Sequence, residues 1–116
     1  MEKIRQDFPK TEKVREKAEI DRIFRTGARF SCKGMVVRCA RNSLGGSRAV
    51  FVASRNFKGA VQRNRAKRIA REVWRLNKTR VVSGYDVAFV LYPGYESFGE
   101  CSPVMLFLLR KAGLVR

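Results

Sequence analysis

The chain has 116 residues, which suits one compact domain, and 45% of them are hydrophobic, as in a globular protein and unlike a disordered tail. Lys and Arg number 26 against 10 Asp and Glu, so the formal net charge is +16. A charge of this size opposes compaction by self-repulsion and favours a polyanionic partner, with nucleic acid ahead of an anionic membrane surface.

The first half of the chain predicts one helix followed by two strands. Residues 1–13 are polar and charged, and we expect a mobile basic arm there. Apolar residues recur at helical spacing over 16–26, and Gly27 follows at the position of a C-terminal cap. Strands are predicted at 34–40 and 48–54, joined by a hairpin loop rich in Gly, Asn and Ser. A short extra strand near 29–32 is an open alternative.

The second half predicts a helix over 60–76, a strand over 85–94 that Pro93-Gly94 stops, and a last helix. The start of the last helix is ambiguous. Ser97 and Glu100 have the spacing of a capping box, whereas Ser102 before Pro103 fits an N-cap followed by proline. We favour Ser102, because proline inside the helix removes a hydrogen bond. The order of elements indicates a single α+β or α/β sandwich with a small sheet.

The helix over 60–76 carries the strongest charge pattern of the chain. At about 100° per residue, its basic and amide side chains fall within an arc of roughly 140° that holds Arg63, Asn64, Lys67, Arg68, Arg71 and Arg75. The apolar side holds Ala66, Ile69, Val73 and Leu76, with Trp74 at the border. A solvated face normally mixes charges, and guanidinium groups suit bidentate contact with phosphate. We therefore expect this face to bind phosphate groups.

Other chemistry has little support in the sequence. Cys32, Cys39 and Cys101 are odd in number and form no CxxC pair, which disfavours a disulfide framework or a four-thiolate zinc site. The chain contains no histidine, and its three aspartates are far apart in sequence. A protein-borne nuclease site is therefore disfavoured. The N-terminus has no signal-like apolar core and no run is long enough to span a membrane, so we expect a soluble, cytoplasmic protein with no membrane partner.

The segment AVQRNRAKRIAREVWR, residues 60–75, resembles the RNR-motif helix of the bacterial ribonuclease P protein subunit. The motif is Ala-Val, Arg-Asn-Arg, Lys-Arg and a further Arg. The flanks IDRIFRTG, RAVFVASRNF, GYDVAFVLYPG and LLRKAGL resemble the first helix, two strands and last helix of the family in the same order. The resemblance covers nearly the whole chain.

The resemblance implies an α/β sandwich like the second domain of ribosomal protein S5, with a left-handed crossover around the RNR helix. It also implies a subunit that assists a catalytic RNA in removing the 5′ leader from precursor tRNA. The RNA, with magnesium ions that it binds itself, carries out the hydrolysis, and the protein holds no cofactor alone. The partners are then the ribonuclease P RNA and the leader of precursor tRNA, and we expect the protein free of RNA to be a monomer.

The matching positions give two sets of expected site residues. The RNA-binding set is Arg63, Asn64, Arg65, Lys67, Arg68 and Arg71. The set expected to line a cleft for the single-stranded leader is Phe24, Val36, Arg38, Ser54 and Arg55. Arg38 replaces a residue that is often aromatic in the family, so its planar group would stack on a base or bind phosphate. The alternative for Phe24 is a plain core role. The alternatives for the whole protein are a ribosomal RNA-binding protein and a stand-alone nuclease.

Overall fold

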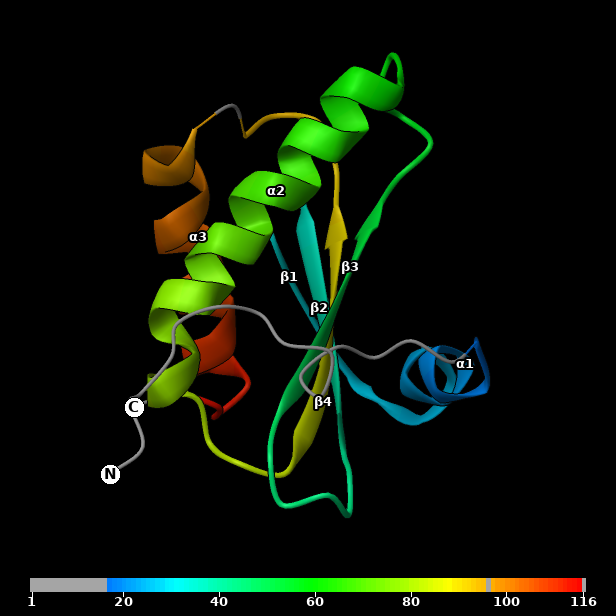
Figure 1. Cartoon of the computed structure of the whole chain (residues 1–116), viewed down its shortest axis with the longest axis vertical. Helices are drawn as coiled ribbons and strands as arrows, with labels where there is room; N and C mark the ends of the chain where they lie inside the picture. The colour runs from blue at the N-terminus through cyan, green and yellow to red at the C-terminus, as the bar shows by residue number, and fades with distance from the viewer. Residues whose placement is uncertain (1–16, 96, 116) are drawn as a thin grey trace, which may run out of the picture.

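A computed structural model describes residues 17–95 and 97–115 (Figure 1). The expected arm over residues 1–13 lies outside these ranges. The elements, in chain order, are α1 (Lys17–Thr26), β1 (Ala28–Cys32), β2 (Met35–Arg41), β3 (Arg48–Ala53), α2 (Ala60–Asn77), a 3-10 turn (Lys78–Arg80), β4 (Tyr85–Leu91) and α3 (Phe98–Lys111). The predicted elements are therefore confirmed, and the optional first strand exists as β1.

The four strands form one mixed sheet in the order β1-β2-β4-β3. β2 is antiparallel to both β1 and β4, and β3 is parallel to β4. The predicted hairpin between β2 and β3 is wrong, because β4 lies between them and pairs with both. The loop of residues 42–47 instead passes the segment just before β4. There the Asn42 backbone amide donates to the Gly84 carbonyl, and the Ser47 hydroxyl donates to the Val82 carbonyl.

Helices cover the two faces of the sheet unequally. α2 and α3 pack on one face, and α1 packs on part of the other (Figure 1). The alternation of side chains in β4 explains the split, since Val87 and Phe89 join the large core whereas Ala88 contacts the cluster around Ile23 of α1. The Trp74 ring of α2 meets the Phe89 ring edge-on at 5.8 Å between centroids.

The connection from β3 to its parallel neighbour β4 runs through α2 (Figure 1). With α2 in front of the sheet and both strands pointing upwards, β4 lies to the left of β3 at the arrowheads in the upper part of the view, so the crossover is left-handed as expected. Most crossovers between parallel strands are right-handed. The left-handed path leaves α2 across the sheet with its long outer side uncovered by any described element.

The last helix begins earlier than predicted. α3 starts at Phe98, and the Ser97 hydroxyl accepts a hydrogen bond from the Glu100 backbone amide, which is the N-cap half of the predicted capping box. Pro103 therefore lies inside the helix, contrary to the preferred start at Ser102. The first turn gains the cap and the burial of Cys101, which is 2% exposed. These gains offset the single hydrogen bond that the proline removes.

Gly27 follows the end of α1, and glycine is not required there by a left-handed backbone conformation. Its amide donates to the Ile23 carbonyl at 2.8 Å, and its φ is not positive. A Cβ at this position would lie 2.4 Å from the Ile23 oxygen and 3.0 Å from the Cys39 oxygen. Glycine is needed here because the helix end approaches β2 backbone to backbone.

Gly27→Ala is expected to lower the free energy of unfolding by about 1–3 kcal/mol, because the backbone must shift to relieve both contacts. Urea unfolding followed by circular dichroism measures the effect. Gly46→Ala is the control, since a Cβ there meets nothing within 4 Å. Equal stabilities for the two variants would contradict this account of Gly27.

Within the described residues, no helix has the length and apolar character needed to cross a bilayer.

Candidate nucleic-acid interface

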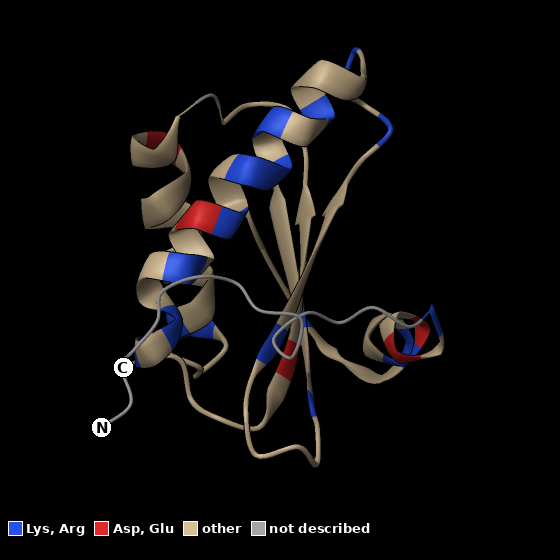
Figure 2. Ribbon diagram, viewed as in Figure 1, with Lys and Arg blue, Asp and Glu red and all other residues tan. Residues whose placement is uncertain are grey.

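α2 places a row of basic side chains on the outside of the molecule. Its inner side is held by Ala70, Val73 and Trp74, which are at most 2% exposed. Figure 2 shows basic residues recurring along the length of α2, with one acidic position among them, which is Glu72 in the sequence. The burial of one side thus fixes the direction in which the other side faces.

The apolar side of α2 is rotated relative to the prediction. Trp74 was placed at the border of the two faces, yet it is 2% exposed. Leu76 was placed on the inner side, yet it is 39% exposed. The helix packs against α3 as well as against the sheet, so its buried arc is centred nearer to Ala70 than a single sheet contact would require.

The predicted RNA-binding residues lie together along α2, and we call them the basic face: Arg63, Asn64, Arg65, Lys67, Arg68 and Arg71. Arg63 and Lys67 are partly buried, and the other four are exposed. Among the described residues, no ion pair or side-chain hydrogen bond engages Arg63, Lys67, Arg68 or Arg71. The acid on this helix, Glu72, is paired with Arg75 instead. The face therefore keeps cationic groups directed at solvent rather than at carboxylates.

The electrostatics of α2 are unfavourable for the isolated protein. The helix begins at Gly59 without a side-chain cap and has no acidic residue in its first turn. Basic groups near a helix N-terminus oppose the helix dipole, and like charges four residues apart, as in Lys67 and Arg71, cost a few tenths of a kcal/mol per pair. A polyanion along this face would offset both the unfavourable helix-dipole interaction and the repulsion between like charges.

The predicted leader-binding residues are only partly brought together. Val36 and Arg38 of β2 point to the sheet face that carries α1, and Phe24 of α1 lies over Arg38. Val36 forms an apolar row with Val90 and Val52, which are paired in register across the sheet. This apolar row continues from α1 along the sheet.

The remaining two leader-binding candidates lie beyond the end of β3. The Ser54 amide donates to the Leu91 carbonyl at 2.8 Å, and its hydroxyl accepts from the Asn56 amide. Arg55 is exposed in the turn that follows. These residues flank the apolar row at one end, whereas Phe24 and Arg38 flank it at its side.

Arg38 is held by α1. Its guanidinium donates to the Phe24 carbonyl at 3.0 Å and lies 5.6 Å from the centre of the Phe24 ring. The carbonyl belongs to the last turn of α1, where a cation is favoured. Arg38 is therefore oriented before any ligand arrives, with a planar cationic group beside the apolar row.

Sequence reasoning missed a buried carboxylate that joins the elements around α1. Asp86 of β4 is 0% exposed and accepts four hydrogen bonds. The donors are Arg48 through two nitrogens at 2.8 Å, Arg22 at 2.9 Å and Asn42 at 2.9 Å. Arg48 also pairs with Glu19 of α1. An aspartate at the start of an otherwise apolar strand, in so basic a chain, was the available signal.

The hydrogen bonds at Asp86 overcome the effect of its burial. Burial by itself raises the pKa of this carboxyl, but hydrogen bonds from Arg48 and Asn42 and the charges of Arg48 and Arg22 bring the net pKa below its ordinary value. Asp86 is therefore ionised at neutral pH, and it is the buried counter-charge that Arg48 and Arg22 share.

Among residues 17–95 and 97–115, no cluster of three or more His, Cys, Asp or Glu side chains is arranged to hold a metal ion. The carboxylates of Asp86 and Glu72 form ion pairs with Arg48 and Arg75.

Fold and charge define a small, basic α+β protein whose crossover helix carries a cationic face of the kind that suits a polyanion. The family model described as Ribonuclease P matches residues 8–112. The chain therefore belongs to the ribonuclease P protein family.

Individual relatives agree with this assignment. The chain is 37% identical over 95 residues to the ribonuclease P protein component of Desulfotalea psychrophila, covering 82% of this chain and 78% of that one. It is 35% identical over 113 residues to that of Syntrophobacter fumaroxidans, covering 94% and 95%.

Solved structures agree as well. The fold matches the RNase P protein of Staphylococcus aureus with a TM-score of 0.81 at 19% identity, covering 90% of this chain and 98% of that one. It matches the RNase P protein of Thermotoga maritima with a TM-score of 0.77 at 27% identity, covering 86% and 96%. The expected mixed sheet with helices is thus confirmed.

Proposed function

We propose that the chain acts in ribonuclease P as the non-catalytic protein subunit, which binds the ribonuclease P RNA through the basic face and the precursor tRNA leader along the apolar row beside α1. The RNA subunit performs the hydrolysis that removes the leader. The protein acts as a monomer in the cytoplasm until it joins the RNA.

The basic face is the observation that carries this proposal. Arg63, Lys67, Arg68 and Arg71 have no carboxylate partner among the described residues, although each is rooted in a helix that the core holds firmly. Arginines in this state are suited to phosphate oxygens, and each phosphate contact releases counterions from the RNA. The protein would thereby lower the repulsion between RNA strands in the complex.

The division of labour follows from the side chains available. The chain has no histidine to act as a general base. Asp86 is locked among arginines, and the described residues offer no cluster fit to hold a metal ion. In this proposal magnesium ions are bound mainly by the RNA, and the protein contributes positive charge and substrate position.

A reconstitution assay tests the proposal. The purified chain is mixed with a bacterial ribonuclease P RNA and precursor tRNA at a magnesium concentration at which the RNA alone is slow. We expect the protein to accelerate leader removal, because its charge substitutes for part of the cations that the RNA needs. No acceleration, or cleavage by the protein without the RNA, would contradict the proposal.

The leader contact has a separate prediction. Arg38→Ala is expected to weaken binding of leader-bearing precursor tRNA to the reconstituted complex by about 5-fold or more, the value of one lost stacking contact. Binding of tRNA without a leader should not change, so the ratio of the two affinities isolates the effect. Arg110→Ala, an exposed cation on α3, is the control of equal charge. An unchanged ratio for Arg38→Ala would remove it from the leader site.

A further inference from the structure

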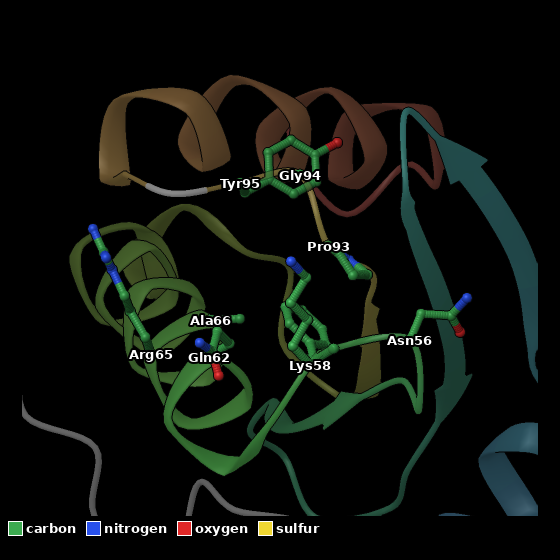
Figure 3. Close-up of a pocket in the computed structure, with 9 residues that line it drawn as sticks. Asn56, Lys58, Gln62, Arg65, Ala66, Pro93, Gly94 and Tyr95 are labelled. Carbon is green, nitrogen blue, oxygen red and sulfur yellow. The ribbon is translucent and has the colours of Figure 1, made fainter.

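A surface cavity of about 380 Å³ lies at the beginning of α2, separate from the apolar row (Figure 3). Three segments form it: residues 56–58 before the helix, the first two turns of α2, and residues 93–95 after β4. Lys58 extends between α2 and the segment that carries Pro93 and Tyr95 (Figure 3). The volume is within the range of sites that hold one small ligand.

The lining combines flat apolar groups with amide and basic side chains. Phe57, Pro93 and Tyr95 supply the apolar groups, and the Tyr95 hydroxyl donates to the Lys33 carbonyl, which holds the ring in place. Asn56 and Gln62 supply amides that both donate and accept hydrogen bonds. None of the nine described lining residues is acidic, and Lys58 supplies a cation.

This combination fits a nucleotide better than a simple anion or an apolar molecule. A free phosphate makes no use of an aromatic ring and a proline, and an apolar ligand makes no use of two amides and an ammonium group. A nucleobase stacks on aromatic faces and forms hydrogen bonds at its edge, while its phosphate requires a cation.

We propose that the cavity binds one unstacked nucleotide of an RNA that lies along α2, with its base beside Tyr95 and its phosphate at Lys58. The proposal rests on the proposed function, since the basic face must first bring RNA to the helix. Arg65 belongs both to the basic face and to the lining, so the two sites are continuous. The nucleotide comes from ribonuclease P RNA or from precursor tRNA.

The first test is a titration of the full-length, ¹⁵N-labelled protein with adenosine monophosphate and, separately, with inorganic phosphate. We expect adenosine monophosphate to shift the amide signals of Lys58, Gln62, Gly94 and Tyr95 saturably. Phosphate should shift Lys58 alone. Equal shifts by both probes, or shifts confined to other regions, would overturn a nucleotide site.

The second test fills the cavity without changing charge. Gln62→Trp places a large side chain at an exposed helical position on its wall, and Leu76→Trp is the control on the same helix, away from the cavity. We expect Gln62→Trp to abolish the adenosine monophosphate shifts and to weaken RNA binding between about 5- and 150-fold, the range for one stacked base. Leu76→Trp should bind as the unaltered protein does.

Ribonuclease P RNA and precursor tRNA are tested separately, and the RNA whose affinity falls is the source of the nucleotide. Suppose that the unaltered protein binds ribonuclease P RNA and that Gln62→Trp binds each RNA as tightly as the unaltered protein does. The cavity proposal is then wrong, and the proposed function stands. If the unaltered protein does not bind ribonuclease P RNA, the proposed function itself fails. Should Gln62→Trp not fold, Lys58→Gln replaces it and is expected to lower the salt slope of binding by about one unit.

Discussion

Asp86→Ala is expected to lower the free energy of unfolding by about 3–5 kcal/mol, the largest stability effect that we anticipate for a single substitution. The change removes the acceptor of four hydrogen bonds and leaves Arg48, whose side chain is 13% exposed, without its principal counter-charge. α1, the loop after β2, β3 and β4 all contribute to this network. Urea unfolding monitored by circular dichroism measures the loss.

The control is Asp21→Ala, which removes the same charge from an exposed position of α1 and should change stability by less than about 0.5 kcal/mol. The pH dependence gives a second readout. The pKa of Asp86 is lowered in the folded protein, so its stabilisation is present above the unfolded pKa of about 4 and is lost as pH falls through the lower folded value. Unfolding free energy should therefore fall less in Asp86→Asn than in the unaltered protein between about pH 6 and pH 3. Equal pH profiles would show that Asp86 is not stabilised as a carboxylate.

The largest functional effect is expected for the double substitution Arg68→Ala and Arg71→Ala. Both side chains are exposed on the basic face and have no partner among the described residues. If each contacts one phosphate, affinity for ribonuclease P RNA should fall roughly 30-fold near 0.15 M salt, and the slope of log affinity against log salt should decrease by about two units. Filter binding over a salt series gives both quantities.

The matched control removes two charges from another helix. Arg110→Ala with Lys111→Ala lowers the net charge equally, at the end of α3. If the field of the whole protein alone drives binding, the two double variants will behave alike. A loss restricted to the α2 variant supports direct phosphate contacts, whereas unchanged binding by that variant would mean that the basic face is directed at solvent in the complex.

The elements with strong local signals could be predicted from sequence. The spacing of Arg63, Lys67 and Arg71 determines that they share one side of any helix, so the basic face was foreseen before the helix was placed. The position of Gly27 was foreseen as well, although its cause was not. Its close approach to Cys39 of β2 depends on a contact between segments that local pattern does not contain.

The features that sequence did not predict depend on long-range pairing. A Gly- and Ser-rich loop suggests a hairpin locally, but β4 provides a better partner for both β2 and β3. Trp74 is buried because its ring packs against Phe89 of β4, a contact that the helical pattern of α2 does not contain. Asp86 was noted only as a scattered acid, since its arginine partners are as many as 64 residues away in the chain. The leader contacts and the nucleotide cavity remain predictions.

The order of strands has a consequence for biosynthesis. β4 is the third strand across the sheet but the last to leave the ribosome, and both β2 and β3 pair with it. A nascent chain that stops before Tyr85 has a cationic α2 segment but no completed sheet on which to bury Trp74. Short helices in water are marginal without such packing. The proposed RNA-binding surface is thus held in place only once β4 has joined the sheet, late in synthesis of the chain.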